Sequence, residues 1–288
     1  MKSTRFRAYQ LGEIGSSFSY TVDNHITLIE ARYNDVNKEN VISEVLLTGK
    51  DKIDCLHITS WDEDHCNSDE LSVILRSLQP SRIEYPGYKP DTDCGKESEK
   101  LIKKYFEQHK NTTLRCYTPD YLKGLSSGKE LEYNDIIYNP ITIVDNHNDN
   151  SVVKLFRHGR FTVLSLGDCE DSAIAQRIMA CKIASIEVDV LLLAHHGADN
   201  GFTTKEFIDK IAPRVAICSS NYDNEFEHPR KEIRDILYEG EVPLFTTKTG
   251  DVIISCQSGT KATVSNFIGN NEVLSSKKTF ETKLNVPD

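Results

Sequence analysis

Carboxylate and imidazole side chains cluster at four places in this sequence, each directly after a short apolar segment. The first cluster lies in Thr59-Ser-Trp-Asp-Glu-Asp-His65, where Asp62, Asp64 and His65 offer three ligand groups close together. Two carboxylates and an imidazole suit Zn²⁺ or Mn²⁺. By itself, this stretch also fits a solvated turn that caps a following helix.

The second and fourth clusters each contribute one candidate ligand. Asp168 follows Leu164-Ser-Leu-Gly167, where the glycine allows a tight turn that would project the carboxylate from a strand end. His228 precedes Pro229 in the loop after the apolar segment Val215–Cys218. Each residue also has a purely structural explanation that needs no metal: Asp168 would cap a helix, and His228 would be an exposed loop residue.

The third cluster is the pair His195-His196, which directly follows the apolar run 190–194. Neighbouring side chains of an extended chain point in opposite directions, so we expect one imidazole of the pair to face the site. The other would orient a carboxylate or donate a proton as a general acid.

Together the four clusters predict a metal centre, because packing alone does not explain carboxylates and imidazoles at the ends of successive strands. One or two Zn²⁺ or Mn²⁺ ions would lower the pKa of a bound water from 15.7 to about 7 and so favour hydrolysis. We expect Asp64, His195 and His196 to be catalytic. The predicted metal ligands are Asp62, Asp64, His65, Asp168, His195 and His228.

Short, often β-branched apolar segments must position these clusters. They predict strands at Phe18–Tyr20, His25–Ile29, Cys55–Thr59, Val152–Phe156, Thr162–Leu166, Val188–Leu193, Val215–Cys218 and Val252–Cys256. Helical spacing and end signals predict helices at Glu70–Leu78, Lys96–His109, Ala173–Lys182, Thr204–Ile211 and Arg230–Tyr238.

This order of elements predicts one α/β domain. We place it at residues 1–266 and expect the polar stretch 267–288 to be a frayed tail. The run 190–194 is continuously apolar, which is typical of a strand buried on both faces. The irregular stretch Asn111–Asn150 is expected to be an insertion or a lid.

Net charge and hydropathy disfavour several classes of protein for this chain. The 288 residues include 34 Lys and Arg against 44 Asp and Glu, a formal net charge of −10. Tight sequence-independent binding to duplex DNA needs cationic neutralisation of phosphates and is therefore disfavoured. We expect no membrane span and no secretory signal. The scattered cysteines favour reduced thiols. Together these expectations predict a cytoplasmic location.

The order of the motifs resembles the metallo-β-lactamase fold superfamily, and within it the hydrolase domain of ComEC-type competence proteins. That domain carries Thr-His-Pro-Asp-Ala-Asp-His, similar to residues 59–65, and its Gly-Asp and His-His-Gly-Ser motifs resemble Gly167-Asp168 and His195-His-Gly-Ala198. The resemblance covers residues 7–257. It implies a four-layer αββα sandwich with a metal site at one edge, and a hydrolytic activity that typically acts on phosphodiesters.

Departures from the family pattern bear on the predicted metal centre. Ser60 stands where the family has its first histidine, Glu30-Ala-Arg32 replaces Asp-Gly-Gly, and Cys66-Asn67-Ser68 replaces Ile-Gly-Gly. Serine is a poor ligand beside imidazole, so one of two metal positions is expected to be weak or empty. His57 is expected to be structural, and the role of His147 stays open.

Two functions remain open at this stage. The first is a phosphodiesterase or nuclease that acts on nucleic acid or on nucleotides. The second is a catalytically weakened metallo-β-lactamase-fold component that acts as a binding or regulatory partner in a multi-protein system, and Ser60 motivates it. Lys100, Lys103 and Lys104 either guide a nucleic-acid strand or form a solvated helix face.

Overall fold

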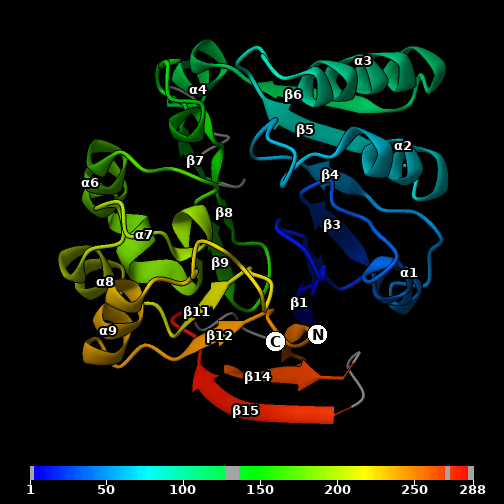
Figure 1. The fold of residues 1–288 in the computed structure, drawn as a ribbon. Helices are drawn as coiled ribbons and strands as arrows, with labels where there is room; N and C mark the ends of the chain where they lie inside the picture. Colours follow the sequence, from blue (N-terminus) through cyan, green and yellow to red (C-terminus); the bar gives the residue numbers. More distant parts are fainter. Residues whose placement is uncertain (1–2, 127–135, 270–272, 285–288) are drawn as a thin grey trace.

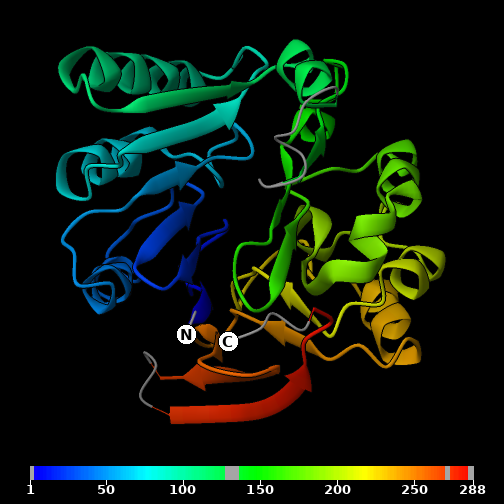
Figure 2. The same cartoon turned by 180° about the vertical axis from the view of Figure 1, so that it is seen from behind.

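Two β-sheets stack face to face and carry helices on both outer sides in the computed structural model of the protein (Figures 1 and 2). The structure describes residues 3–126, 136–269 and 273–284. Within these ranges the first sheet has nine strands in the order β15-β14-β13-β1-β2-β3-β4-β5-β6, and the second has six in the order β12-β11-β10-β9-β8-β7. The predicted αββα sandwich is confirmed.

The first sheet combines antiparallel and parallel pairing. Strands β3 to β6 are parallel to one another, and the other neighbours are antiparallel. Its strands are β1 (Thr4–Ala8), β2 (Phe18–Val22), β3 (His25–Ile29), β4 (Cys55–His57), β5 (Arg82–Pro86), β6 (Thr113–Tyr117), β13 (Val252–Cys256), β14 (Lys261–Ile268) and β15 (Val273–Glu281). Along its outer face lie α1 (Lys38–Leu47), α2 (Ser68–Ser77) and α3 (Asp93–Gln108).

The second sheet is parallel from β9 to β12, and β7 and β8 run antiparallel. Its strands are β7 (Ile136–Asn139), β8 (Val153–Phe156), β9 (Thr162–Ser165), β10 (Val188–Leu192), β11 (Val215–Cys218) and β12 (Leu244–Thr246). Its outer face carries α6 (Ser172–Ala180), α7 (Lys182–Glu187), α8 (Lys205–Ile211) and α9 (Lys231–Glu239). The remaining elements are α4 (Pro119–Ser126) and the 3₁₀ turns η1 (Asn148–Asn150) and η2 (Ala194–Gly197).

Three buried apolar layers hold the sandwich together. Side chains such as Phe6 and Val190 fill the layer between the sheets, and each sheet packs a further layer against its own helices. In β10, Val190 and Leu192 face the other sheet while Leu191 faces the helices. The predicted strand buried on both faces is therefore confirmed.

All eight predicted strands and all five predicted helices occur, with ends shifted by a few residues. The predicted insertion at Asn111–Asn150 begins with β6, which completes one edge of the first sheet, and continues into α4. That expectation is therefore wrong for this part, and residues 127–135 lie outside the described ranges.

The predicted boundary after residue 266 falls inside β14. The stretch expected to be a frayed tail contains β15, which pairs with β14 from Lys261–Glu281 to Ile268–Val273. Its polar side chains are exposed because β15 is an edge strand, and polarity alone therefore suggested a tail.

None of the helices in the described part of the chain combines the length and the apolar character that crossing a bilayer requires.

A buried ionic cluster joins the two sheets beside their apolar interface. The Glu84 carboxylate in β5 lies 2.5 Å from Nζ of Lys154 in β8, and Nδ1 of His57 lies 3.0 Å from it. Arg82 and Arg115 approach the same carboxylate at 3.1 and 3.5 Å. His57 is thus held within the fold, as expected of a structural residue.

Candidate metal centre

The loops that follow β4, β9, β10 and β11 meet at one end of the sandwich. The backbone N–H of His195 donates to the carbonyl of Gly167, which ties the loop after β10 to the loop after β9. Gly167 has φ +55°, and a Cβ there would lie 2.6 Å from Cβ of Ser151. A glycine is therefore required for the turn that presents Asp168.

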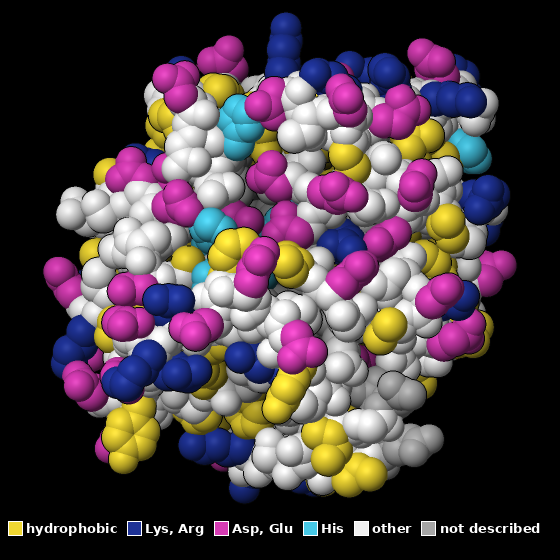
Figure 3. Space-filling model, viewed as in Figure 1, with side chains coloured by type: hydrophobic (Ala, Val, Ile, Leu, Met, Phe, Trp, Pro, Cys, Tyr) yellow, Lys and Arg dark blue, Asp and Glu magenta, His cyan; other side chains and the backbone are white. Residues whose placement is uncertain are grey.

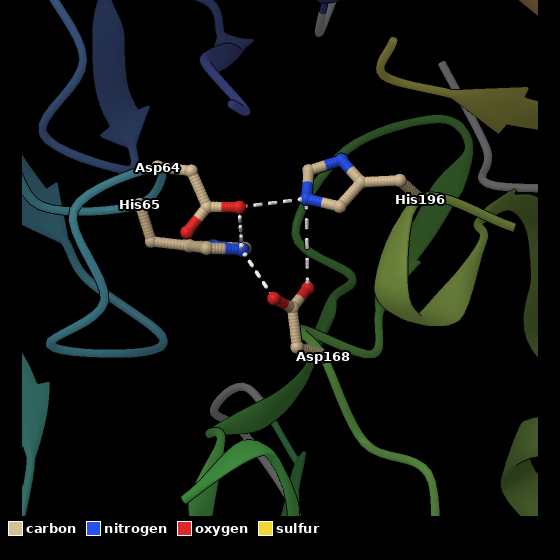
Figure 4. A group of neighbouring side chains, drawn as sticks. All are labelled: Asp64, His65, Asp168 and His196. Atoms are coloured by element: carbon tan, nitrogen blue, oxygen red, sulfur yellow. Dashed lines mark hydrogen bonds and ion pairs between the residues drawn. The ribbon is translucent and has the colours of Figure 1, made fainter. Parts of the chain in front are cut away.

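Four of the ligand-type side chains in these loops converge on one point. Asp64, His65, Asp168 and His196 each offer an atom within 4.8 Å of the others (Figure 4). Nε2 of His65 lies 2.9 Å from Asp168, and Nε2 of His196 lies 3.1 Å from Asp64. The group unites both sheets, because Asp64 and His65 follow β4 and the other two follow β9 and β10.

This donor set fits a divalent cation. It supplies two carboxylate oxygens and two imidazole nitrogens, which are ligands of Zn²⁺ and Mn²⁺. Nε2 of His65 is buried without a well-aligned hydrogen-bond partner in the described ranges, although Asp168 lies close to it. A cation bound between them would give both Nε2 of His65 and the Asp168 carboxylate a partner.

Opposite charges dominate the electrostatics of the group. Burial alone lowers the pKa of His65, but the carboxylates of Asp168 and Asp64 outweigh burial and raise it well above its ordinary value. Burial raises the pKa of Asp64 and Asp168, but the imidazoles of His65 and His196 bring both below the usual range. Both carboxylates are therefore ionised and ready to bind a cation.

Each imidazole of the group is oriented by a second contact on its far side. Nδ1 of His65 lies 3.3 Å from the Glu30 carboxylate, which also accepts a 2.6 Å hydrogen bond from the Thr59 hydroxyl. Nδ1–H of His196 donates to the carbonyl of Ser219 at 2.9 Å. In both rings Nε2 is thereby turned toward the carboxylates.

We expect Glu30→Gln to weaken Mn²⁺ binding by about 10–100-fold, as is typical when the carboxylate behind a ligating histidine is lost. The Glu30 side chain is buried, so its effect would act through His65. Calorimetric titration with Mn²⁺ measures the change, and Glu13→Gln serves as a control because the Glu13 carboxylate is half exposed and pairs with Arg32. Equal affinity in Glu30→Gln and the unmodified protein would contradict this role.

The backbone of the histidine pair differs from the predicted extended conformation. His195 and His196 have φ of 44° and 53°, so both lie in the left-handed region within η2. Such φ values are uncommon for residues other than glycine and store strain, which tends to persist at functional sites. The turn sends His196 into the four-residue group and His195 outward to Glu170, whose carboxylate lies 2.6 Å from Nδ1.

His228 lies next to the group without belonging to it. Its ring stacks on that of His196, with centroids 6.3 Å apart and planes 9° apart, and lies 5.9 Å from the His195 ring. Burial, reinforced by His196 and His195, lowers the pKa of His228 to about 4. The neutral imidazole is therefore available at neutral pH.

Asp62 does not belong to the four-residue group. Its carboxylate accepts a 2.7 Å hydrogen bond from the Ser60 hydroxyl, which also lies 3.0 Å from the Tyr88 hydroxyl. Ser60 thus binds Asp62 rather than completing a ligand set. His147, another candidate, lies 3.3 Å from Asp91 and contacts the Tyr88 ring.

A cavity of about 190 Å³ opens beside the metal-ligand group. Asp64 and His196 form part of its wall, and His195 and His228 line it further out. Figure 3 shows histidine side chains gathered near the middle of this face, with carboxylates around them. A substrate in the cavity would therefore touch both the metal-ligand group and the remaining imidazoles.

Several residues of the site were not predicted from the sequence. Glu30 and Glu170 orient histidines, and Ile14 and Phe226 line the cavity. Glu30 and Glu170 are ordinary acidic residues in the sequence. Each follows a predicted strand end by one or a few positions, and this placement was the available signal.

No family model matches the chain. ComE operon protein 3 of Bacillus subtilis (strain 168) is 23% identical over 209 residues, which cover 71% of this chain. This chain is a distant homologue of that protein. The resemblance inferred from the motifs is thereby confirmed, and the match spans 25% of the relative's length.

Solved structures share the architecture. Igni18, a metallo hydrolase from Ignicoccus hospitalis KIN4/I, aligns with a TM-score of 0.50 at 14% identity over 87% of this chain and 98% of that chain. A protein from Parabacteroides distasonis ATCC 8503 aligns with a TM-score of 0.44 at 13% identity over 82% of this chain and 89% of that chain. The alignment with Igni18 supports the assignment of the fold.

Proposed function

We propose that this chain is a metal-dependent hydrolase that cleaves phosphodiesters of nucleic acid or nucleotides. The observation that carries the proposal is the convergence of Asp64, His65, Asp168 and His196 beside an open cavity, whose wall Asp64 and His196 help to form. Gathering two carboxylates and two imidazoles in a largely buried position costs free energy unless they bind a ligand or pair with one another, and such clusters are typical of functional sites. The fold and the description of Igni18 as a metallo hydrolase support the same reaction class.

A bound Zn²⁺ or Mn²⁺ would supply an acidified water and polarise the phosphoryl oxygens. Asp64, His65, Asp168 and His196 would hold that ion, with Glu30 and Ser219 fixing the two rings. His228 stacks on His196 and limits the movement of that ring. The protein's share of catalysis is thus to position the ligands and to shape the cavity.

We further propose that each chain holds one ion. Ser60 stands where the family's first histidine would contribute to a second ion, and its hydroxyl donates a hydrogen bond to Asp62. Elemental analysis and Mn²⁺ titration should give one ion per chain. Two tightly bound ions would show that the Ser60–Asp62 pair opens and binds metal.

His195 is proposed to donate a proton to the leaving oxygen, because it lines the cavity while Glu170 holds its Nδ1. We expect His195→Ala to lower kcat by about 100-fold on a dinucleotide, whose alkoxide leaving group needs a proton. The loss should be much smaller on bis-p-nitrophenyl phosphate, which releases a stable phenolate. Glu170→Gln should give a weaker version of the same pattern, and equal losses on both substrates would exclude proton donation.

The proposed function is tested with the unmodified protein and bis-p-nitrophenyl phosphate. Hydrolysis should appear with Mn²⁺ or Zn²⁺, disappear with a chelator and return when the ion is restored. Failure to bind either ion at saturating concentration would remove the hydrolase assignment.

The second candidate function is a binding or regulatory component, which the Ser60–Asp62 pair favours. It predicts that the chain binds one ion and hydrolyses neither bis-p-nitrophenyl phosphate nor a dinucleotide. Ion binding together with absent turnover would therefore replace the first function by the second.

A further inference from the structure

The structure assigns to Phe226 the role of a stacking platform for an aromatic base, which makes a nucleotide-sized phosphoester the substrate of the cavity. This inference rests on the proposed function and narrows its substrate to small esters that carry a base. A duplex or a long strand would find no lysine or arginine in the part of the cavity wall that the structure describes.

The cavity wall presents an aromatic ring to solvent. Phe226 is 50% exposed and Ile14 is 41% exposed, and both line the cavity that contains Asp64 and His196. The Phe226 ring stacks on His228, with centroids 5.6 Å apart and planes 25° apart, and His228 in turn stacks on His196. A series of rings therefore leads from the metal-ligand group to an open aromatic face.

Cations such as Arg234 and Lys248 lie in a hollow that shares Asn224 with the cavity, but the wall of the cavity itself does not suit a polyanion. Among the described residues that line it, none is lysine or arginine. Two nearby guanidinium groups are already engaged, because Arg32 contacts Glu13 and Glu70 and Arg230 contacts the Phe226 carbonyl and Glu227. Binding a nucleic-acid strand requires many cationic contacts to phosphates, so recognition here must come from another interaction.

The one dense basic cluster predicted from the sequence lies elsewhere. Lys100 and Lys103 belong to α3 on the outer face of the first sheet and pair with Glu97 and Glu99. These lysines form a solvated, charge-balanced helix face. They provide no cationic track that leads a strand into the cavity.

A free amide beside the aromatic face completes the recognition of a base. Asn221 lines the cavity, and its side chain makes no hydrogen bond within the described ranges. The neighbouring Asn224 is engaged, since it donates to the carbonyls of Asn221 and His228. Stacking on an aromatic ring combined with an amide that both donates and accepts is the usual way in which proteins bind an unpaired base.

The inference is tested by calorimetry on the Mn²⁺-loaded full chain with AMP and with ribose 5-phosphate, which carries the same phosphate without a base. We expect AMP to bind about tenfold more tightly or better, because stacking of its base on an aromatic ring adds favourable binding free energy that ribose 5-phosphate cannot gain. Phe226→Ala should remove this preference by weakening AMP alone, and Phe226→Tyr should retain it. Tyr222→Ala is the matched control, since Tyr222 is a 72% exposed aromatic residue of the same loop outside the cavity wall.

The outcomes separate this inference from the proposed function. Equal affinity for the two ligands, or equal weakening of both by Phe226→Ala, would overturn the stacking role while leaving metal-dependent hydrolysis intact. If neither ligand binds and no Mn²⁺-dependent hydrolysis of bis-p-nitrophenyl phosphate occurs, both the inference and the proposed function fail.

Discussion

Asp168→Asn should lower the affinity for Mn²⁺ by at least about 100-fold and reduce Mn²⁺-dependent hydrolysis of bis-p-nitrophenyl phosphate to background. Asp168 is the more buried of the two carboxylates and contacts both imidazoles of the group, at 2.9 Å from His65 and 3.9 Å from His196. Asparagine keeps the size of the side chain and removes its charge. At a buried site that loss is poorly compensated by solvent, and 100-fold corresponds to about 2.7 kcal/mol.

Asp62→Asn is the matched control for this experiment. Asp62 lies in the same loop as Asp64 and was predicted to be a ligand, but its carboxylate accepts a hydrogen bond from Ser60 and lies outside the four-residue group. Its replacement should leave Mn²⁺ affinity within a few-fold of the unmodified protein. A loss as large as that of Asp168→Asn would mean that Asp62 binds the ion and that the group identified here is incomplete.

The parts of the fold that apolar patterning dictates were predictable from the sequence. Strands such as β10 carry continuous apolar residues because both of their faces are buried, and their ends place polar residues at one edge of the sandwich. This is why Asp64, His65 and Asp168 could be grouped before their contacts were known. The grouping required topology, since these residues come from both sheets.

Elements stabilised by distant partners were missed. Strand β5 has the sequence Arg-Ile-Glu-Tyr-Pro, and its central Glu84 interrupts the apolar pattern. The partner that makes this buried carboxylate tolerable, Lys154, lies 70 residues away in the sequence. Helix α1 was also missed, since Leu46 and Leu47 are 60% and 69% exposed and blur the amphipathic pattern. Such contacts are invisible to a local reading of hydropathy.

The choice between His195 and His196 depended on backbone geometry that the sequence does not specify. An extended chain would place the two rings on opposite sides, whereas the observed left-handed turn directs His196 to Asp64 and His195 to Glu170. Gly197, with φ +81°, continues this turn, and a Cβ there would lie 2.8 Å from Cβ of Pro229. The pair is thus shaped by packing against the loop that carries His228.

Glu84→Gln should lower the free energy of unfolding by about 3–5 kcal/mol, the range typical of removing one partner from a buried ion pair. The side chains of Glu84 and Lys154 are 0% and 1% exposed, and the ammonium lies 2.5 Å from the carboxylate. Burial alone would raise the pKa of Glu84, but Lys154 and His57 bring it well below its ordinary value. The ionised carboxylate therefore stabilises the folded state, and glutamine would leave the buried ammonium facing a neutral amide.

Urea unfolding of Glu84→Gln, Lys154→Met and the double variant measures this effect. The double variant should recover much of the loss, because it removes the buried ammonium together with its carboxylate, and the arginines that also contact Glu84 are partly exposed to solvent. Glu99→Gln is the surface control, since Glu99 pairs with Lys103 at 2.8 Å across exposed side chains and should change stability by less than about 1 kcal/mol. If Glu84→Gln lowers the free energy of unfolding no more than Glu99→Gln does, the ionic cluster between the sheets does not stabilise the sandwich. Apolar packing alone would then hold the two sheets together.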